Sequence, residues 1–535
     1  MPDASPVPTP PDLSEPTLTT RQLFFRVFPS IVLAMFLAAI DNTIVATALP
    51  NIAASLGDVE RVSWVVVSYL MATTVAAAVY GRLGDALGRK PLLLVSLAVF
   101  IIASLLCALA PTMLLLVGAR VLQGIGGGGL APSEQSMLAD TFPPAKRGQA
   151  FAAYAFVIIV APVLGPTIGG WVTDSYSWHW IFLINVPVGA LSLFLVGTFV
   201  DEPKALVEER KARLKKGLSV DWIGFLLVAI GLGSLELFLD RGERDDWFGS
   251  SFITATAIVA GVAIAFLVIW ETTRKDPIVN LRLMANRNFA AVLAVMFTTG
   301  VILFGSTQLI PQMLQQVFHY TATNAGLAMT AGGIATVCAV PIVGRLVGKV
   351  DVRLLLGGAL TVSALALWHL TSLDTNASFA SIAWARAYQA VALPFLFVPI
   401  TNAAYTGLKP NQTSEASSLL NVFRNLGGSV GIALSQATLS DRTQIHQSRL
   451  VEHLNPLAPN YPAGLANIES TLRGAGIAAG QAQQAALGQL YQIVQRQASM
   501  MAYLDVFGDL MIFTLCVAPV VFLLKSPKGG RGGAA

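Results

Sequence analysis

The chain has 535 residues, of which 54% are hydrophobic and only 12% carry a charge, and its mean hydropathy is +0.65. A soluble domain of ordinary composition carries about 25% charged residues, so this chain lacks the polar surface of a large soluble enzyme. The net charge of +4 does not indicate a nucleic-acid partner, because most Lys and Arg sit in short connections between apolar runs.

The apolar runs predict the architecture. Residues 1–26 are rich in Pro and predict a disordered tail. After that tail, runs of about 20 apolar residues, the length that crosses a bilayer, recur along the chain. We expect an all-α polytopic membrane protein with fourteen spans, near residues 27–50, 63–81, 92–110, 113–139, 149–172, 180–199, 221–239, 251–271, 289–314, 323–345, 353–373, 380–405, 413–438 and 500–524.

Basic residues predict which side of the membrane each end faces. If the N-terminus is cytoplasmic, most of the 34 Lys and Arg fall in the tails and in the connections on that side. This bias fixes the orientation of membrane proteins. Because the predicted number of spans is even, both termini are expected in the cytoplasm.

Two connections are longer than the others. Residues 201–220 are basic and predict a linker that lies against anionic lipid. Residues 441–499 form the only long segment expected on the external side. Leu487, Leu490 and Val494 recur there at helical spacing, so we expect a helical excursion that runs straight into the last span.

Two motifs occur twice. GRLGDALGRK begins at Gly81 and has a degenerate copy at Gly344, while ARVLQG around Arg120 has a copy around Arg386. The copies lie about 265 residues apart in both cases, which indicates two related halves of the kind many transporters use. The predicted layout is a six-helix bundle at 27–200, two inserted helices at 221–271, a second six-helix bundle at 289–524 and a tail at 525–535.

Several stretches resemble motifs of one family. IDNTIVATALP at 40–50 resembles LDxTIVNVALP, and residues 81–91 fit the loop motif GxLxDxxGRK. PVLGPTIGG at 162–170 resembles the fifth-span motif of exporters. The chain therefore resembles the major facilitator superfamily, and within it the fourteen-span drug:proton antiporters of the EmrB and QacA type, closest to EmrB-like exporters.

The resemblance implies an antiporter of a bacterial inner membrane, with protons as the coupling ion and no other cofactor. It also implies hydrophobic small-molecule substrates in a lipid bilayer. The external segment is similar to that of exporters that dock a periplasmic adaptor protein, which in turn connects to an outer-membrane channel. No metal-ligand spacing and no set of catalytic residues indicates an enzyme.

Three ionisable residues in spans are candidates for proton coupling. A carboxylate at the bilayer centre costs roughly 3 kcal/mol, so Asp41 must face a cavity, pair with a cation or be protonated. Glu134 follows the same argument, although it could instead snorkel to the cytoplasmic edge. Arg120 stays charged and needs a carboxylate or backbone partner, and the resemblance makes it the partner of a proton-carrying acid. Arg386 and Arg424 are weaker candidates of the same kind.

The loop motif and the fifth-span motif predict moving parts. The resemblance assigns conformational gating to Gly81, Asp85, Gly88, Arg89 and Lys90, with plain topological charge as the alternative. In the fifth span, glycines allow close helix contact and prolines allow bending. The residues concerned are Pro162, Gly165, Pro166, Gly169 and Gly170.

A substrate pocket is expected where the two halves meet near mid-membrane. Candidate lining residues, with ordinary packing as the alternative, are Met35, Phe36, Phe297, Phe304 and Gln308. Glu236 joins them, although its place beside Asp240 and Arg241 also predicts a structural ion pair.

Three functions fit the sequence. The first is proton-coupled export of hydrophobic or amphipathic molecules by alternating access. The second is export of an endogenous metabolite, lipid or siderophore. The third is a receptor or scaffold on the same fold, which would need no titratable residue within the membrane.

Overall fold

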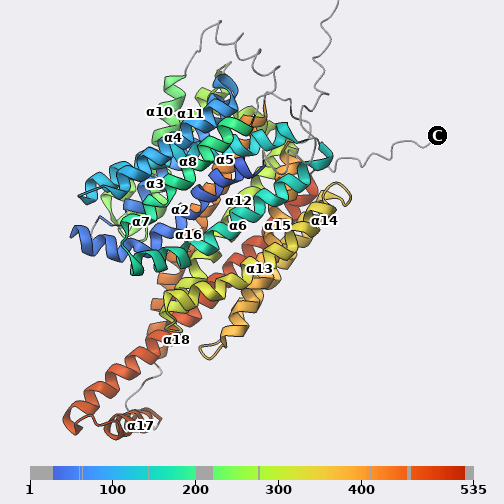
Figure 1. Cartoon of the computed structure of the whole chain (residues 1–535). Helices are drawn as coiled ribbons and strands as arrows, with labels where there is room; N and C mark the ends of the chain where they lie inside the picture. The colour runs from blue at the N-terminus through green and yellow to red at the C-terminus, as the bar shows by residue number, and fades with distance from the viewer. Residues whose placement is uncertain are drawn as a thin grey trace, which may run out of the picture.

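The computed structural model describes residues 28–58, 61–62, 64–142, 144–200, 221–274, 277–405, 408, 412–452, 454 and 460–524. The predicted tails at 1–26 and 525–535 and the basic linker at 201–220 lie outside these residues, as does nearly all of the segment 453–459. Every named element in the described part of the chain is helical (Figure 1).

The helices follow one another in the order of the predicted spans. The first half holds α2 (Phe28–Leu56), α3 (Trp64–Leu87), α4 (Arg89–Ala108), α5 (Met113–Thr141), α6 (Pro144–Ser175), α7 (His179–Leu183) and α8 (Asn185–Phe199). The insert holds α10 (Trp222–Arg241) and α11 (Ser251–Thr273). The second half holds α12 (Arg287–Gln316), α13 (Ala322–Leu346), α14 (Val352–Thr371), α15 (Phe379–Ala404), α16 (Thr413–Glu452), α17 (Asn460–Gly474) and α18 (Ala479–Val517).

Twelve spans among the described residues are long and apolar enough to cross a bilayer, and α7 with α8 counts as one of them. The other two predicted spans correspond to α6 and α16, which are not among these twelve. The buried residues of α16 include many polar ones, among them Ser417, Asn421 and Arg424, which lowers its hydropathy. Length and composition therefore support twelve membrane spans among the described residues, and the predicted total of fourteen spans stays a prediction.

The surface of the helices is apolar where it faces outward. On α11, Ile258, Phe266 and Ile269 are each more than 60% exposed. Large apolar side chains that are exposed over most of their surface are typical of a helix that faces lipid. This agrees with a multi-pass membrane protein.

The two ends of the bundle differ in how the halves meet. We call the end with the α3–α4 connection the Gly88 end, and the end that carries α17 the α17 end. At the Gly88 end, one hydrophobic cluster joins residues of both halves, such as Phe151 and Tyr405, whose rings stack 5.5 Å apart. At the α17 end, each half has a cluster of its own. The halves are thus packed together at the Gly88 end.

The last helices extend beyond the bundle at the α17 end (Figure 1). Arg496 of α18 donates from Nε to the carbonyl of Val317 at 2.8 Å and from Nη2 to that of Thr375 at 2.9 Å. Both acceptors lie just past helix ends, so the part of α18 before Arg496 projects roughly 25 Å outward at 1.5 Å per residue. The segment predicted at 441–499 therefore forms the end of α16, all of α17 and the first turns of α18.

Candidate functional site

A buried ion pair lies in the middle of the first half. Nη1 of Arg120 on α5 donates to Oδ2 of Asp41 on α2 at 2.6 Å, and both side chains are at most 1% exposed. Two charges removed from water in this way need further hydrogen bonds to offset their lost hydration. The stability of the pair therefore depends on the hydrogen bonds that surround it.

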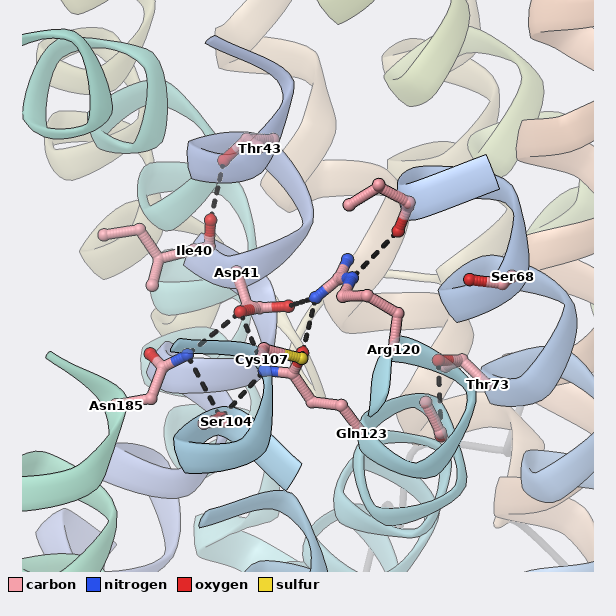
Figure 2. Close-up of polar contacts among 12 residues, drawn as sticks. Ile40, Asp41, Thr43, Ser68, Thr73, Ser104, Cys107, Arg120, Gln123 and Asn185 are labelled. Carbon is pink, nitrogen blue, oxygen red and sulfur yellow. Dashed lines mark hydrogen bonds and ion pairs between the residues drawn. The ribbon is translucent and has the colours of Figure 1, made fainter. Parts of the chain in front are cut away.

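Three polar residues complete the network (Figure 2). Oδ1 of Asp41 accepts from Gln123 Nε2 at 3.0 Å and from Asn185 Nδ2 at 2.9 Å. Gln123 also donates to Ser104 at 2.8 Å. Asp41 thus has three donors around its buried carboxylate, and such hydrogen bonds to a carboxylate are among the strong ones in proteins.

Arg120 is held on its other sides as well. Its Nε donates to the carbonyl of Val65 at 2.9 Å, and its Nη1 also donates to Gln123 Oε1 at 2.6 Å. The guanidinium lies over the ring of Tyr69, 4.1 Å from the centroid, a cation–π contact. The sequence predicted that Arg120 needs a carboxylate or backbone partner, and the structure gives it both.

Sequence reasoning missed Ser104 and Asn185 as members of the network, and it quoted Gln123 only within a motif. The available signal was the rarity of polar side chains in the middle of apolar runs. Asn185 also begins α8 at the point where the predicted sixth span is broken into α7 and α8. That break could not be located from an unbroken apolar run.

Glu134 on α5 lies in a different environment. It is 0% exposed, and neither carboxylate oxygen has a hydrogen-bond partner among the described residues. The interpretation that it snorkels to the cytoplasmic edge is therefore wrong. A charged carboxylate in this position would be severely destabilised, so the neutral acid is the stable form in this conformation.

A cavity of about 100 Å³ lies between the two halves, near the middle of the helices. Its walls come from α2, α3, α5, α12 and α16. They are mainly apolar or weakly polar, with Met35, Tyr69 and Phe304 facing Asn421 and Arg424. The prediction of a pocket where the halves meet agrees with this arrangement.

The candidate lining residues separate into two groups. Met35 and Phe304 line the cavity. Phe36 is half-buried and packs against the hydrophobic cluster of the Gly88 end, and Phe297 packs against the second half's cluster at the α17 end. Gln308 is exposed and is not among the described residues that line the cavity.

Glu236 lies one layer behind the cavity wall. It is 3% exposed, and its Oε1 accepts from Thr74 Oγ1 at 3.0 Å; its carboxylate also bonds to Ser429. Thr74 belongs to the first half and Ser429 to the second, and both line the cavity. The expected ion pair with Arg241 is wrong, because Arg241 pairs with Asp245 at 3.1 Å.

The gating motif lies where the halves close on each other. Arg89 forms an ion pair with Asp140, and its Nε donates to Ser414 of the second half at 2.9 Å. A side chain on Gly81 would collide with Ser418, so glycine permits this close approach. Gly88 has φ 94°, which also favours glycine. Lys90 donates to the carbonyl of Gly197 at 2.9 Å, and the side chain of Asp85 lies outside the described residues.

The fifth-span motif lies on α6. Gly165 packs against Thr43 of α2 so closely that a side chain would collide with it. Gly169 is buried, whereas a side chain on Gly170 would meet open space. The side chains of Pro162 and Pro166 lie outside the described residues. Close helix contact is thus found at Gly165, as the motif predicts.

Comparison with known proteins decides the family. The sequence profile described as Major Facilitator Superfamily matches residues 31–432. The chain belongs to the major facilitator superfamily. It is therefore a membrane transporter and not an enzyme. Within the described residues, no group of three or more His, Cys, Asp or Glu side chains is arranged to hold a metal ion.

Relatives in this superfamily cover nearly the whole chain. The multidrug export protein EmrB of Escherichia coli (strain K12) is 36% identical over 503 residues, which cover 94% of this chain and 95% of EmrB. The fatty acid resistance protein FarB of Neisseria gonorrhoeae is 34% identical over 94% of this chain and 96% of FarB. The solved structure of the proton:xylose symporter XylE has a TM-score of 0.58 at 14% identity, covering 93% of this chain and 96% of XylE, and shares the major facilitator fold.

Proposed function

We propose that this major facilitator protein is a proton-driven exporter of hydrophobic and amphipathic small molecules in a bacterial inner membrane. The observation that carries the proposal is the cavity between the two halves, which lies beside buried ionisable residues. A cavity at this place can face either side in turn when the halves rock against each other. The names of EmrB and FarB, which describe multidrug export and fatty acid resistance, support export over import.

The orientation follows from the distribution of charge. The Gly88 end carries Arg82, Arg89 and Lys90, and basic residues favour the cytoplasmic side. With the Gly88 end in the cytoplasm, both termini are cytoplasmic. The described conformation is then closed toward the cytoplasm, with Arg89 and Ser414 among the contacts that close it.

The Asp41–Arg120 pair supplies a place where a proton changes the energy of the conformation. An ionised Asp41 neutralises Arg120. If Asp41 takes up a proton, the buried guanidinium is left without its counter-charge, and its neighbours must rearrange. Such a change in a buried ion pair can shift the balance between two packings of helices.

Glu134 supplies a second proton site of a different kind. With no hydrogen-bond partner for either oxygen, it holds a proton in the described conformation. A conformation that admits water to Glu134 would stabilise the carboxylate and release that proton. Protons are the only coupling ion that this proposal requires.

The experiment that tests the proposal compares efflux with and without a proton gradient. A fluorescent hydrophobic dye is added outside everted inner-membrane vesicles, the vesicles are energised, and dye accumulation inside them is followed with the wild-type chain and with Asp41→Asn. We expect accumulation that an uncoupler abolishes and that the variant lacks. Accumulation that persists in the presence of the uncoupler would rule out proton coupling, and a wild type that moves no dye would rule out export.

We further propose that α17 and the first turns of α18 dock an adaptor protein outside the membrane, which connects to an outer-membrane channel. Leu487, Tyr491 and Ile493 are 42 to 56% exposed on the part of α18 that projects beyond the bundle. Apolar side chains exposed together outside the bundle are typical of a protein-binding surface.

A further inference from the structure

Arg424 is the one charged side chain among the described residues that line the cavity. It lies on α16, and Asn421, Asn425 and Gly428 of the same helix line the cavity beside it. These positions are three or four residues apart and therefore share a helix face. The second half thus turns a face with a guanidinium toward the cavity.

Among the residues that the structure describes, the guanidinium of Arg424 has almost no hydrogen-bond partner. Arg424 is 8% exposed, and its Nε and Nη1 have no hydrogen-bond partner in the described part of the chain. Its one contact of this kind is from Nη2 to Asn425 Oδ1, at the long distance of 3.5 Å. Most of the donors of a buried, permanently charged group are therefore unsatisfied.

No described carboxylate neutralises this charge. Glu134 and Arg424 are both close enough to Tyr154 to act on it electrostatically, but no ion pair joins Glu134 to Arg424, and both Glu134 oxygens lack hydrogen-bond partners. Arg120 in the first half differs, because Asp41 lies 2.6 Å from it. A buried charge without a partner is costly to keep unless it has something to bind.

We infer that Arg424 binds the acidic group of an anionic amphiphile, a carboxylate or a sulfonate, so that the exporter prefers anionic substrates to cationic ones. This inference rests on the proposed function, whose substrate class it narrows. The planar guanidinium matches two oxygens of such a group at once. Met35, Ala38 and Phe304 supply an apolar wall for the rest of the molecule.

The size of the cavity limits what it holds in this conformation. Drug-sized ligands occupy pockets of about 300–1,000 Å³, whereas this cavity measures about 100 Å³. It has room for the acidic group and a few attached atoms. The apolar body of the substrate enters when the halves separate.

Three ligands with the same ring and different head groups test the inference. Naphthalene-2-sulfonate, naphthalene-2-sulfonamide and 2-naphthyltrimethylammonium are titrated by calorimetry into the purified full chain, in nanodiscs of zwitterionic phosphatidylcholine so that no anionic lipid competes. We expect the wild type to bind the sulfonate at least about tenfold more tightly than the ammonium ligand. Arg424→Gln should lose that preference and bind the sulfonamide with little change.

Two further variants separate charge recognition from damage to the fold. Arg424→Lys keeps the charge and should retain most of the preference for the sulfonate. Arg61→Gln removes a charge from the connection between α2 and α3, where Arg61 is 65% exposed, and should bind all three ligands as the wild type does. Thermal unfolding of each variant shows that it is folded.

Equal binding of sulfonate and ammonium by the wild type would overturn the inference, as would unchanged sulfonate binding by folded Arg424→Gln. A wild type that binds none of the three ligands would also overturn it. The proposed function is tested apart from this by dye accumulation in energised vesicles. If the wild type accumulates dye but does not prefer the sulfonate, the inference about Arg424 fails and proton-driven export stands. If it binds the sulfonate but accumulates no dye, proton-driven export fails.

Discussion

Arg386 in the second half repeats the place of Arg120 in the first, but without the carboxylate. Nη1 of Arg120 donates to Gln123 at 2.6 Å, and Nη1 of Arg386 donates to Gln389 at 2.7 Å. Arg386 lies 266 residues after Arg120, and the residue 266 positions after Asp41 is Thr307. Its Oγ1 lies 3.5 Å from Arg386 Nη2. The two halves thus share the Arg–Gln pair, and only the first half carries the acid.

This difference predicts the effect of placing an acid in the second half. Thr307→Asp should form an ion pair with Arg386, which is 1% exposed and has no partner at Nε. We expect the melting temperature of the purified protein to rise, by an amount that corresponds to about 1–3 kcal/mol. Thr307→Asn is the matched control. An Asp variant no more stable than the Asn variant would show that the two side chains do not meet.

Replacing the carboxyl group by an amide should affect stability at Asp41 but not at Glu134. Asp41→Asn leaves Arg120 buried without a counter-charge, and we expect it to destabilise the protein by about 3–5 kcal/mol. Glu134→Gln replaces a neutral, unbonded acid by a neutral amide, so its melting temperature should stay close to that of the wild type. Scanning fluorimetry of both variants checks this. A large loss of stability in Glu134→Gln would mean that Glu134 has a partner and carries a charge.

Arg89 is expected to hold the Gly88 end closed. Arg89→Gln loses the ion pair with Asp140 and weakens the bond to Ser414, so we expect the halves to separate there more often. Spin labels at the exposed Leu87 and Leu354, one in each half, report the distance by electron paramagnetic resonance. The distribution should shift to longer distances in the variant. An unchanged distribution would assign the closure to other contacts.

Loss of the exposed apolar residues of α18 should lower the drug resistance of cells and leave dye accumulation in vesicles unchanged. Leu487→Ser combined with Tyr491→Ser removes apolar surface from the adaptor-binding segment without touching the cavity. We expect normal dye accumulation in everted vesicles and reduced drug resistance of the cells. A paired change at Gln484 and Gln492, also to Ser, is the control. Full resistance of the Leu487 and Tyr491 variant would argue against a partner at this surface.

Much of the fold could be predicted because the bilayer imposes a simple rule. Spans need long apolar runs, and a buried Arg120 needs a carboxylate or a backbone partner. The sequence left the choice open, and the structure supplies both Asp41 and the carbonyl of Val65. The repeated motif around Arg386 likewise predicted two halves, and the structure repeats the Arg–Gln pair. These features depend on local sequence and on the cost of charge in hydrocarbon.

Other features depend on how distant helices meet, and the sequence does not contain that information directly. Glu236 lies near Arg241 in sequence, yet α10 turns it toward Thr74 of the first half. Gln308 was expected to line the pocket, yet it is exposed and is not among the described residues that line the cavity. The packing of the halves at the Gly88 end, seen in the contact of Arg89 with Ser414, belongs to one conformation and could not be read from composition.

The central claim is that a buried acid gains and loses a proton as substrate moves. The most direct measurement is proton uptake or release when an exported compound is added to the purified protein in weakly buffered nanodiscs, read with a pH indicator. We predict a proton signal in the wild type that is smaller in Glu134→Gln and in Asp41→Asn, and that disappears when both are changed. A wild type that binds the compound with no proton signal, or a double variant with the full signal, would contradict the account.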